Sequence, residues 1–284
     1  MKKPMLVSKR NWLLGVVAVG VVAIIAVSVM VVGLNSAGAE KGVPMAPSGP
    51  ITVDEAMEAV RQFEGASLPD LELANVAYTP DGSNPSKLVM LKCDGAKYGV
   101  NLANGMVEVA LYRTSRSSDV MVSEDEARSI ATRFAEESRA GFSALAPVDS
   151  QLCDRGTYSE YDFKWAEVIG GATTPNMAYV SVNAATGEVT MFVSKYLEIE
   201  PFASPSVTKG DAQAIATAAF EEKTGKGVLV SEPVLEVTLE PDWIQHLVWR
   251  VVVDEVREST ELTNSAVFLI EAHTGEILVT GMAG

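Results

Sequence analysis

Residues 182–189 read VNAATGEV, and residues 270–277 read IEAHTGEI. An earlier segment, NLANG at residues 101–105, places a glycine at the end of a similar turn. Each segment is flanked by apolar or alternating residues, which is the pattern of two strands joined by a tight turn. A glycine at this place suits a left-handed backbone conformation that residues with a Cβ atom resist. The three segments therefore predict three β-hairpins.

A helix start precedes each hairpin. A Thr or Ser stands before an apolar stretch of helical spacing and has an acid three residues later. The pairs are Thr52 with Glu55, Ser123 with Glu126, and Thr208 with Asp211. Such a hydroxyl can accept a hydrogen bond from the backbone N–H at the third helical position, and the acid can return one. We expect this reciprocal capping box in the first two helices and an Asp variant of it in the third.

Further strand-like segments lie between each helix and its hairpin, so the chain is predicted to contain three copies of one unit. The copies span residues 51–113, 122–197 and 206–282. Each is predicted to be a helix on a roughly four-stranded antiparallel sheet, an α+β fold. Trp165 and Trp249 are predicted core residues on matching strands of the last two copies. Units of this size are marginally stable alone, so we expect them to pack on one another.

A long apolar run precedes the repeats. Residues 12–34 contain Ser28 as their only polar side chain. As a helix they would extend roughly 35 Å, enough to cross a hydrocarbon core of about 30 Å. The tail at residues 1–11 carries four basic residues, which favours a cytoplasmic N-terminus. The sequence therefore predicts a single-pass signal anchor in the cytoplasmic membrane, with residues 35–284 outside the cytoplasm.

The segment after the apolar run is rich in Gly, Ala and Pro. Residues 35–50 lack hydrophobic periodicity and are predicted to form a flexible stalk between the anchor and the first unit. A cleavable signal peptide is the alternative, because residues 37–39 read AGA, a form that signal peptidase accepts. Cleavage after Ala39 would release the protein as a secreted one.

The chain is strongly acidic. Its net charge is −15, and the four basic residues of the tail leave −19 on the remainder. Such a surface repels nucleic acid phosphates, so we expect no nucleic acid partner. The charge can serve solubility alone, and weak cation binding or a basic partner is the alternative.

The repeated motifs resemble the PepSY domain family. Those motifs are a helix that opens with Ser/Thr-x-x-acid-Ala, a Trp-bearing strand and a closing V-x-A-x-T-G-E-V/I hairpin. Residues 122–281 carry the resemblance best, and residues 51–112 share less of it because they lack the Trp and the Thr-Gly-Glu. Members of the family include propeptides of thermolysin-like peptidases and membrane-anchored, YpeB-like envelope proteins. The resemblance implies a non-catalytic extracytoplasmic module that binds or restrains a partner such as a peptidase or envelope hydrolase.

The sequence contains no recognisable catalytic motif. The chain has two histidines, His246 and His273, and contains neither HExxH nor GxSxG. Its glycine pairs do not follow a strand and open a helix, as phosphate binding requires. We place His273 in an exposed turn and His246 beside a strand, both outside any catalytic site. The sequence thus predicts a protein that is not an enzyme, with no catalytic residue, cofactor or metal ligand.

Acidic pairs and cysteines leave alternatives open. The glutamates at residues 136–137 and 221–222 are interpreted as solvated helix ends, with calcium or a basic partner as the alternative. Cys93 and Cys153 could form one disulfide between two units or remain free thiols.

Three functions follow from these observations. The first is a non-catalytic, membrane-anchored binding or regulatory module with a protein or peptide partner in the envelope. The second is an acidic structural or cation-binding surface protein, for which the charge is the motivation. The third is a carboxylate-based envelope hydrolase, which rests on the abundance of acids alone.

Overall fold

The computed structural model describes residues 50–65, 68, 70–78, 87–224, 228–239, 244–255 and 265–283. The predicted tail at 1–11, the predicted anchor at 12–34 and the predicted stalk, except Pro50, lie outside these residues. Within the described ranges, no helix combines the length and apolar character needed to cross a membrane.

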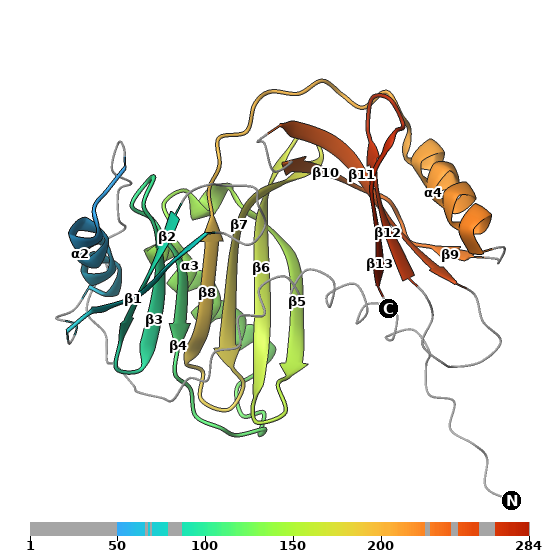
Figure 1. The fold of residues 1–284 in the computed structure, drawn as a ribbon. Helices are drawn as coiled ribbons and strands as arrows, with labels where there is room; N and C mark the ends of the chain where they lie inside the picture. The colour runs from blue at the N-terminus through green and yellow to red at the C-terminus, as the bar shows by residue number, and fades with distance from the viewer. Residues whose placement is uncertain are drawn as a thin grey trace, which may run out of the picture.

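Three stretches of the chain each fold as one helix followed by antiparallel strands (Figure 1). Unit 1 (residues 51–112) contains α2 (Val53–Glu64), β1 (Glu72–Tyr78), β2 (Lys87–Cys93), β3 (Ala96–Asn101) and β4 (Val107–Tyr112). Unit 2 (residues 122–195) contains α3 (Glu124–Ser138), η2 (Phe142–Ala144), β5 (Ala146–Asp154), β6 (Ser159–Ile169), β7 (Ala172–Asn183) and β8 (Val189–Lys195). Unit 3 (residues 207–283) contains α4 (Lys209–Thr224), β9 (Val228–Val230), β10 (Val234–Leu239), β11 (Gln245–Glu255), β12 (Ser265–Glu271) and β13 (Ile277–Ala283).

The helices begin where the capping residues predict. In α2 the hydroxyl of Thr52 accepts from the Glu55 N–H, and the Glu55 carboxylate accepts from the Thr52 N–H at 2.7 Å. Thr208 and Asp211 make the same pair of bonds at the start of α4. Ser123 caps α3 by accepting from the Glu126 N–H at 3.3 Å, a single bond in place of the predicted reciprocal pair. Each cap satisfies donors that the first helical turn leaves without a partner.

The closing hairpins have the predicted left-handed glycines, with φ of 68°, 75° and 77° at Gly105, Gly187 and Gly275. The helix of the same unit lies against the turn. A Cβ atom at Gly187 would lie 3.3 Å from Ile130 of α3, and one at Gly275 would lie 3.2 Å from Ile215 of α4. Backbone conformation and close packing together therefore favour glycine at both turns.

The α+β class is as predicted, but the arrangement of the sheets is not. We expected three four-stranded sheets that pack on one another. Instead the described strands form one 13-stranded mixed sheet, in which β4 of unit 1 pairs antiparallel with β8 of unit 2. Units 1 and 2 therefore join edge to edge, in the order β1-β2-β3-β4-β8-β7-β6-β5.

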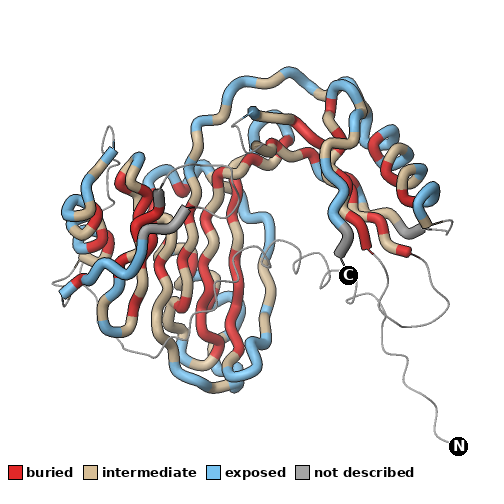
Figure 2. The backbone as a smooth tube through the Cα atoms, viewed as in Figure 1, coloured by how far each residue is buried: buried red, intermediate tan, exposed pale blue. Residues whose placement is uncertain are grey.

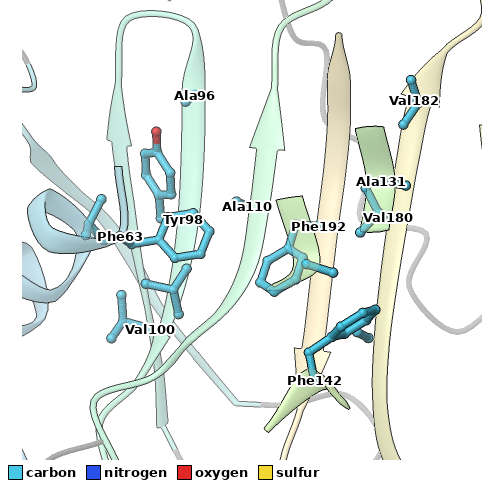
Figure 3. Packing of buried hydrophobic residues seen from close by; sticks show 14 of the residues in the cluster. Phe63, Ala96, Tyr98, Val100, Ala110, Ala131, Phe142, Val180, Val182 and Phe192 are labelled. Atoms are coloured by element: carbon cyan, nitrogen blue, oxygen red, sulfur yellow. The ribbon is translucent and has the colours of Figure 1, made fainter. Parts of the chain in front are cut away.

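Pairing of β4 with β8 brings α2 and α3 to the same face of the sheet and merges their cores (Figures 1 and 2). Phe63 of α2, Phe134 of α3 and Phe192 of β8 meet there, with ring centroids 5.5 to 6.2 Å apart. Figure 3 shows Phe63 beside Tyr98 of β3 and near Phe192. Aromatic side chains bury large areas and favour such edge-on contacts, so this cluster joins the two units.

Unit 3 has a core of its own beneath α4. One parallel pair, Glu236 of β10 with Thr173 of β7, connects its strands to unit 2. A small apolar cluster, with Ala172, Leu235 and Leu247 among its buried members, also bridges the two units. Unit 3 is therefore attached less extensively than unit 1 is.

The two tryptophans are core or half-buried, but their strand positions do not match. Trp165 pairs with Ala178 and Trp249 pairs with Ile270, which lie nine and five residues before the turn glycines. Tyr161, which pairs with Val182, therefore holds the place in unit 2 that Trp249 holds in unit 3. The two strands match as predicted, since β6 and β11 each pair with the first strand of the closing hairpin, but the tryptophans stand four residues apart when counted from the turn glycine.

The aromatic cluster yields the first prediction. Phe192→Ala should lower the free energy of unfolding by roughly 3 to 5 kcal/mol, because it removes a fully buried ring from between two helices. Urea denaturation followed by circular dichroism measures the loss. The control is Tyr196→Ala, just beyond β8, whose side chain is 54% exposed and should change stability by less than about 0.5 kcal/mol. Equal effects of the two substitutions would contradict the assigned packing.

Candidate functional site

A depression of about 430 Å³ lies on unit 3, beside the segment that joins it to unit 2. Three parts of the chain form it: the joining segment, the start of β11 and the turn between β12 and β13. We call the joining segment, residues 196–206, the strap. The lining residues are Glu200, Pro201, Phe202, Ile244, Gln245, His246, Leu247, Glu271 and His273.

Two side-chain amides hold the strap in place. The amide of Asn176 accepts from the Leu197 N–H at 2.6 Å and donates to the Leu197 carbonyl at 2.9 Å. Gln245 does the same at Glu200, at 3.0 and 2.8 Å. Each amide thereby imitates the two hydrogen bonds of a neighbouring strand. The segment between units, expected only as a boundary, is thus a fixed wall of the depression.

The far end of the strap docks on the last hairpin. The backbone N–H groups of Ser206 and Val207 both donate to the carbonyl of Ala272. The equivalent segment before α3 uses Met121 and Val122 to donate to Ala184 in the same way. This repeated contact sets where each helix starts relative to its own hairpin.

Both histidines of the chain lie in this depression, although sequence reasoning placed neither in a site. His246 is on β11 opposite Thr238, and His273 is in the turn between β12 and β13. They are separated along the chain and line the same depression because β11 and β12 are neighbours in the sheet. A functional role for the depression therefore could not be found from the spacing of the histidines.

The depression carries a fixed negative charge at Glu271. Partial burial raises the pKa of Glu271, but hydrogen bonds from the N–H groups of Thr274 and His273 outweigh it and hold the pKa below its usual value. These bonds are 2.6 and 2.8 Å long. The carboxylate is therefore an acceptor already engaged with the turn, which makes it a poor proton donor.

The remaining lining is mixed. Phe202 and Leu247 pack on the apolar cluster between units 2 and 3, whereas Ile244 is 50% exposed. Glu200 is exposed and adds a second carboxylate. Apolar side chains beside acidic ones suit a partner segment with apolar and basic residues.

A second polar cluster lies on unit 2, on the sheet face opposite α3. The guanidinium of Arg155 donates to Glu160 at 2.7 Å and to Asp162 at 2.8 Å. Both acids are almost completely buried, and the hydroxyls of Thr190 and Ser181 donate to them at 2.6 and 2.7 Å. Every carboxylate in the cluster is thus engaged, as expected of a structural ion network rather than an acid and base pair.

The cluster has perturbed protonation equilibria. Burial, helped by the nearby Asp162 charge, raises the pKa of Glu160 above its usual value. Burial and a hydrogen bond with Asp162 raise the pKa of Cys153 to about 12. Cys153 is therefore a neutral thiol at physiological pH and a weak nucleophile.

The cysteines are free thiols, which decides between the two alternatives. Cys93 is on β2 and Cys153 is on β5, six strand steps apart in the sheet. At about 4.8 Å per step the separation is far beyond the reach of a disulfide. Burial also raises the pKa of Cys93.

The acidic pairs at helix ends lie where the sequence suggested. Residues 136–137 and 221–222 are exposed on α3 and α4. Among the described residues, no three His, Cys, Asp or Glu side chains converge to hold a metal ion. Trp165 packs against Phe142 at 5.2 Å, and the Trp249 indole donates to the Val207 carbonyl, so both serve packing.

The buried carboxylate of Glu160 yields the second prediction. Its pKa is higher in the folded than in the unfolded state, so its contribution to stability is full at low pH and is lost as pH rises through the folded pKa. As the pH rises above about 4, the unmodified protein should therefore lose stability relative to its Glu160→Gln variant. Urea denaturation across pH 4 to 8 measures it. The exposed Glu276→Gln is the control, and a pH-independent difference for Glu160→Gln would contradict the assignment.

Several solved structures resemble the chain, two of them as follows. No family model matches the chain, and no curated protein matches it. The C-terminal domain of YpeB from Bacillus megaterium is 16% identical over 84% of this chain and 100% of that one, with a TM-score of 0.46. A candidate lipoprotein of Clostridium difficile 630 is 15% identical over 59% of this chain and 97% of that one, with a TM-score of 0.22. These scores are too low to assign the chain to a family.

Proposed function

We propose that this protein is a non-catalytic extracytoplasmic binding module, held at the cytoplasmic membrane by residues 12–34, that takes an extended segment of a partner protein in the depression of unit 3. The depression carries the proposal, because its walls are fixed before any partner arrives. Preorganised walls reduce the ordering cost of binding. The anchor and the external location are supported by the apolar run and its basic flank alone.

The charge of the depression defines the partner segment. Glu200 and Glu271 provide two carboxylates, and Phe202 and Ile244 provide apolar contact area. A segment that alternates basic and apolar side chains would satisfy both. The net charge of −15 would also speed its approach.

The PepSY resemblance supports the same class of function. The motifs at residues 122–281 imply a module that binds or restrains a partner, with a peptidase or an envelope hydrolase as the partner class. The repeated helix, cap and hairpin turn are in keeping with that resemblance. Membership of the family is part of this proposal.

The two other functions gain less from the structure. A carboxylate hydrolase needs one acid that can donate a proton, whereas Glu271 has a lowered pKa and Glu160 is enclosed by its partners. A cation-binding role continues to rest on net charge. The binding module is the function that a specific surface of the protein favours.

The third prediction tests the depression. Glu200→Lys should reduce the amount of crosslinked partner recovered from membranes roughly tenfold, because it reverses a charge that faces the bound segment. Glu198→Lys is the matched control, since it makes the same change at an exposed strap residue outside the lining. Quantitative mass spectrometry of the crosslinked complexes gives the readout. Equal recovery with both variants would rule out the depression as the site, and recovery of no partner with the unmodified chain would rule out the function.

A further inference from the structure

The seam between units 1 and 2 has a local two-fold axis. In the pairing of β4 with β8, Ala110 lies opposite Phe192, while Val109 and Leu111 lie opposite Val193 and Met191. Ala110 is five residues beyond the turn glycine Gly105, and Phe192 is five residues beyond Gly187. Structurally equivalent positions of the two units therefore face each other, as they do in a symmetric dimer interface.

The equivalent strand of unit 3 has no such partner. Its last strand, β13, ends the sheet in the part of the chain that the structure describes. Thr280, five residues beyond Gly275, holds the place of Ala110 and Phe192. Ala110 and Phe192 are fully buried, whereas Thr280 is exposed and Val279 is 51% exposed.

The other edges of the described sheet carry features that discourage further pairing. Strand β1 begins at the charged Glu72 and contains a bulge. Pro147 and Asp149 flank a bulge in β5, and Pro233 lies in the break between β9 and β10. By contrast, β13 has neither a charged residue nor a proline. Its one register shift, close to the turn, recurs beside β4 and β8, where it does not prevent pairing. Exposed apolar edges without such features tend to acquire a partner strand.

Taken together, these observations lead us to infer that β13 is an interface for a second copy of this chain. The two β13 strands pair antiparallel about an axis at Thr280, which places Val279 of each copy opposite Gly281 of the other. This arrangement repeats the β4–β8 seam between molecules. Two chains anchored in the same membrane can adopt it, because a two-fold axis along the membrane normal leaves both anchors on the same side.

The side chains at this edge indicate a reversible association. The helix position filled by Phe63 in α2 and Phe134 in α3, eleven residues after the cap, is Ala219 in α4. Phe192 is likewise replaced by Thr280. Small residues allow the second copy to approach without a clash, but they forgo the aromatic contacts that hold units 1 and 2 together.

The fourth prediction is a disulfide on the axis. In the full-length chain in detergent micelles, Thr280→Cys should give a covalent dimer on mild oxidation, because opposite residues of an antiparallel pair have Cα atoms about 4.5 to 5.5 Å apart. The unmodified protein controls for Cys93 and Cys153, and Gln213→Cys on the exposed side of α4 controls for random collision. Both controls should remain monomeric on denaturing gels.

A second variant tests the same surface without a crosslink. Thr280→Lys should weaken self-association at least about tenfold in light scattering, because two like charges would face each other on the axis. If the unmodified chain is monomeric at tens of micromolar, the inference is overturned. This holds even if another segment of the same chain covers β13. So would a dimer that persists in Thr280→Lys, since its interface would then lie elsewhere. A covalent link from Thr280→Cys to a different protein would overturn it as well.

Discussion

Antiparallel pairing of β4 with β8 is the contact on which the rest of the architecture depends. It places α2 and α3 on one face, so that Phe63, Phe134 and Phe192 can close a core that neither unit completes alone. Units of this size are only marginally stable alone, so the merged core adds stability to both. The opposite face of unit 2 carries the Arg155 ion network, in which hydrogen bonds satisfy the buried carboxylates of Glu160 and Asp162.

Unit 3 follows a different rule. Its helix packs on its own strands, and its link to unit 2 is one parallel strand pair, a small apolar cluster and the strap. The amides of Asn176 and Gln245 give the strap a definite path. This path creates the depression, so the site proposed for a partner is a consequence of how two units are joined.

Local features of the fold could be predicted from sequence, and long-range ones could not. The caps at Thr52 and Thr208 and the turn glycines depend on residues within one turn, which a short motif contains. The pairing of β4 with β8 joins the edges of two units, and the sequence of neither strand indicates which strand it will pair with. The tryptophans of the matching strands β6 and β11 differ in position for a related reason, since register is set by the hairpin turn and not by residue type.

The candidate site was missed because its parts are distant in the sequence. His246, His273 and Glu200 come from three elements, and the strap has the composition of a linker. Its one indication was Phe202, an aromatic residue between two prolines. The folded chain brings together lining residues that the sequence keeps apart.

The central claim is that units 1 and 2 form one continuous sheet. Hydrogen exchange of the backbone amides in β4 and β8 tests it most directly, because edge strands exchange far faster than strands paired on both sides. The account predicts that the amides of Ala110 and Phe192, which point across the seam, exchange as slowly as those in the middle of β7. Exchange at the rate of the edge strand β1 would mean that the two units are not joined as described.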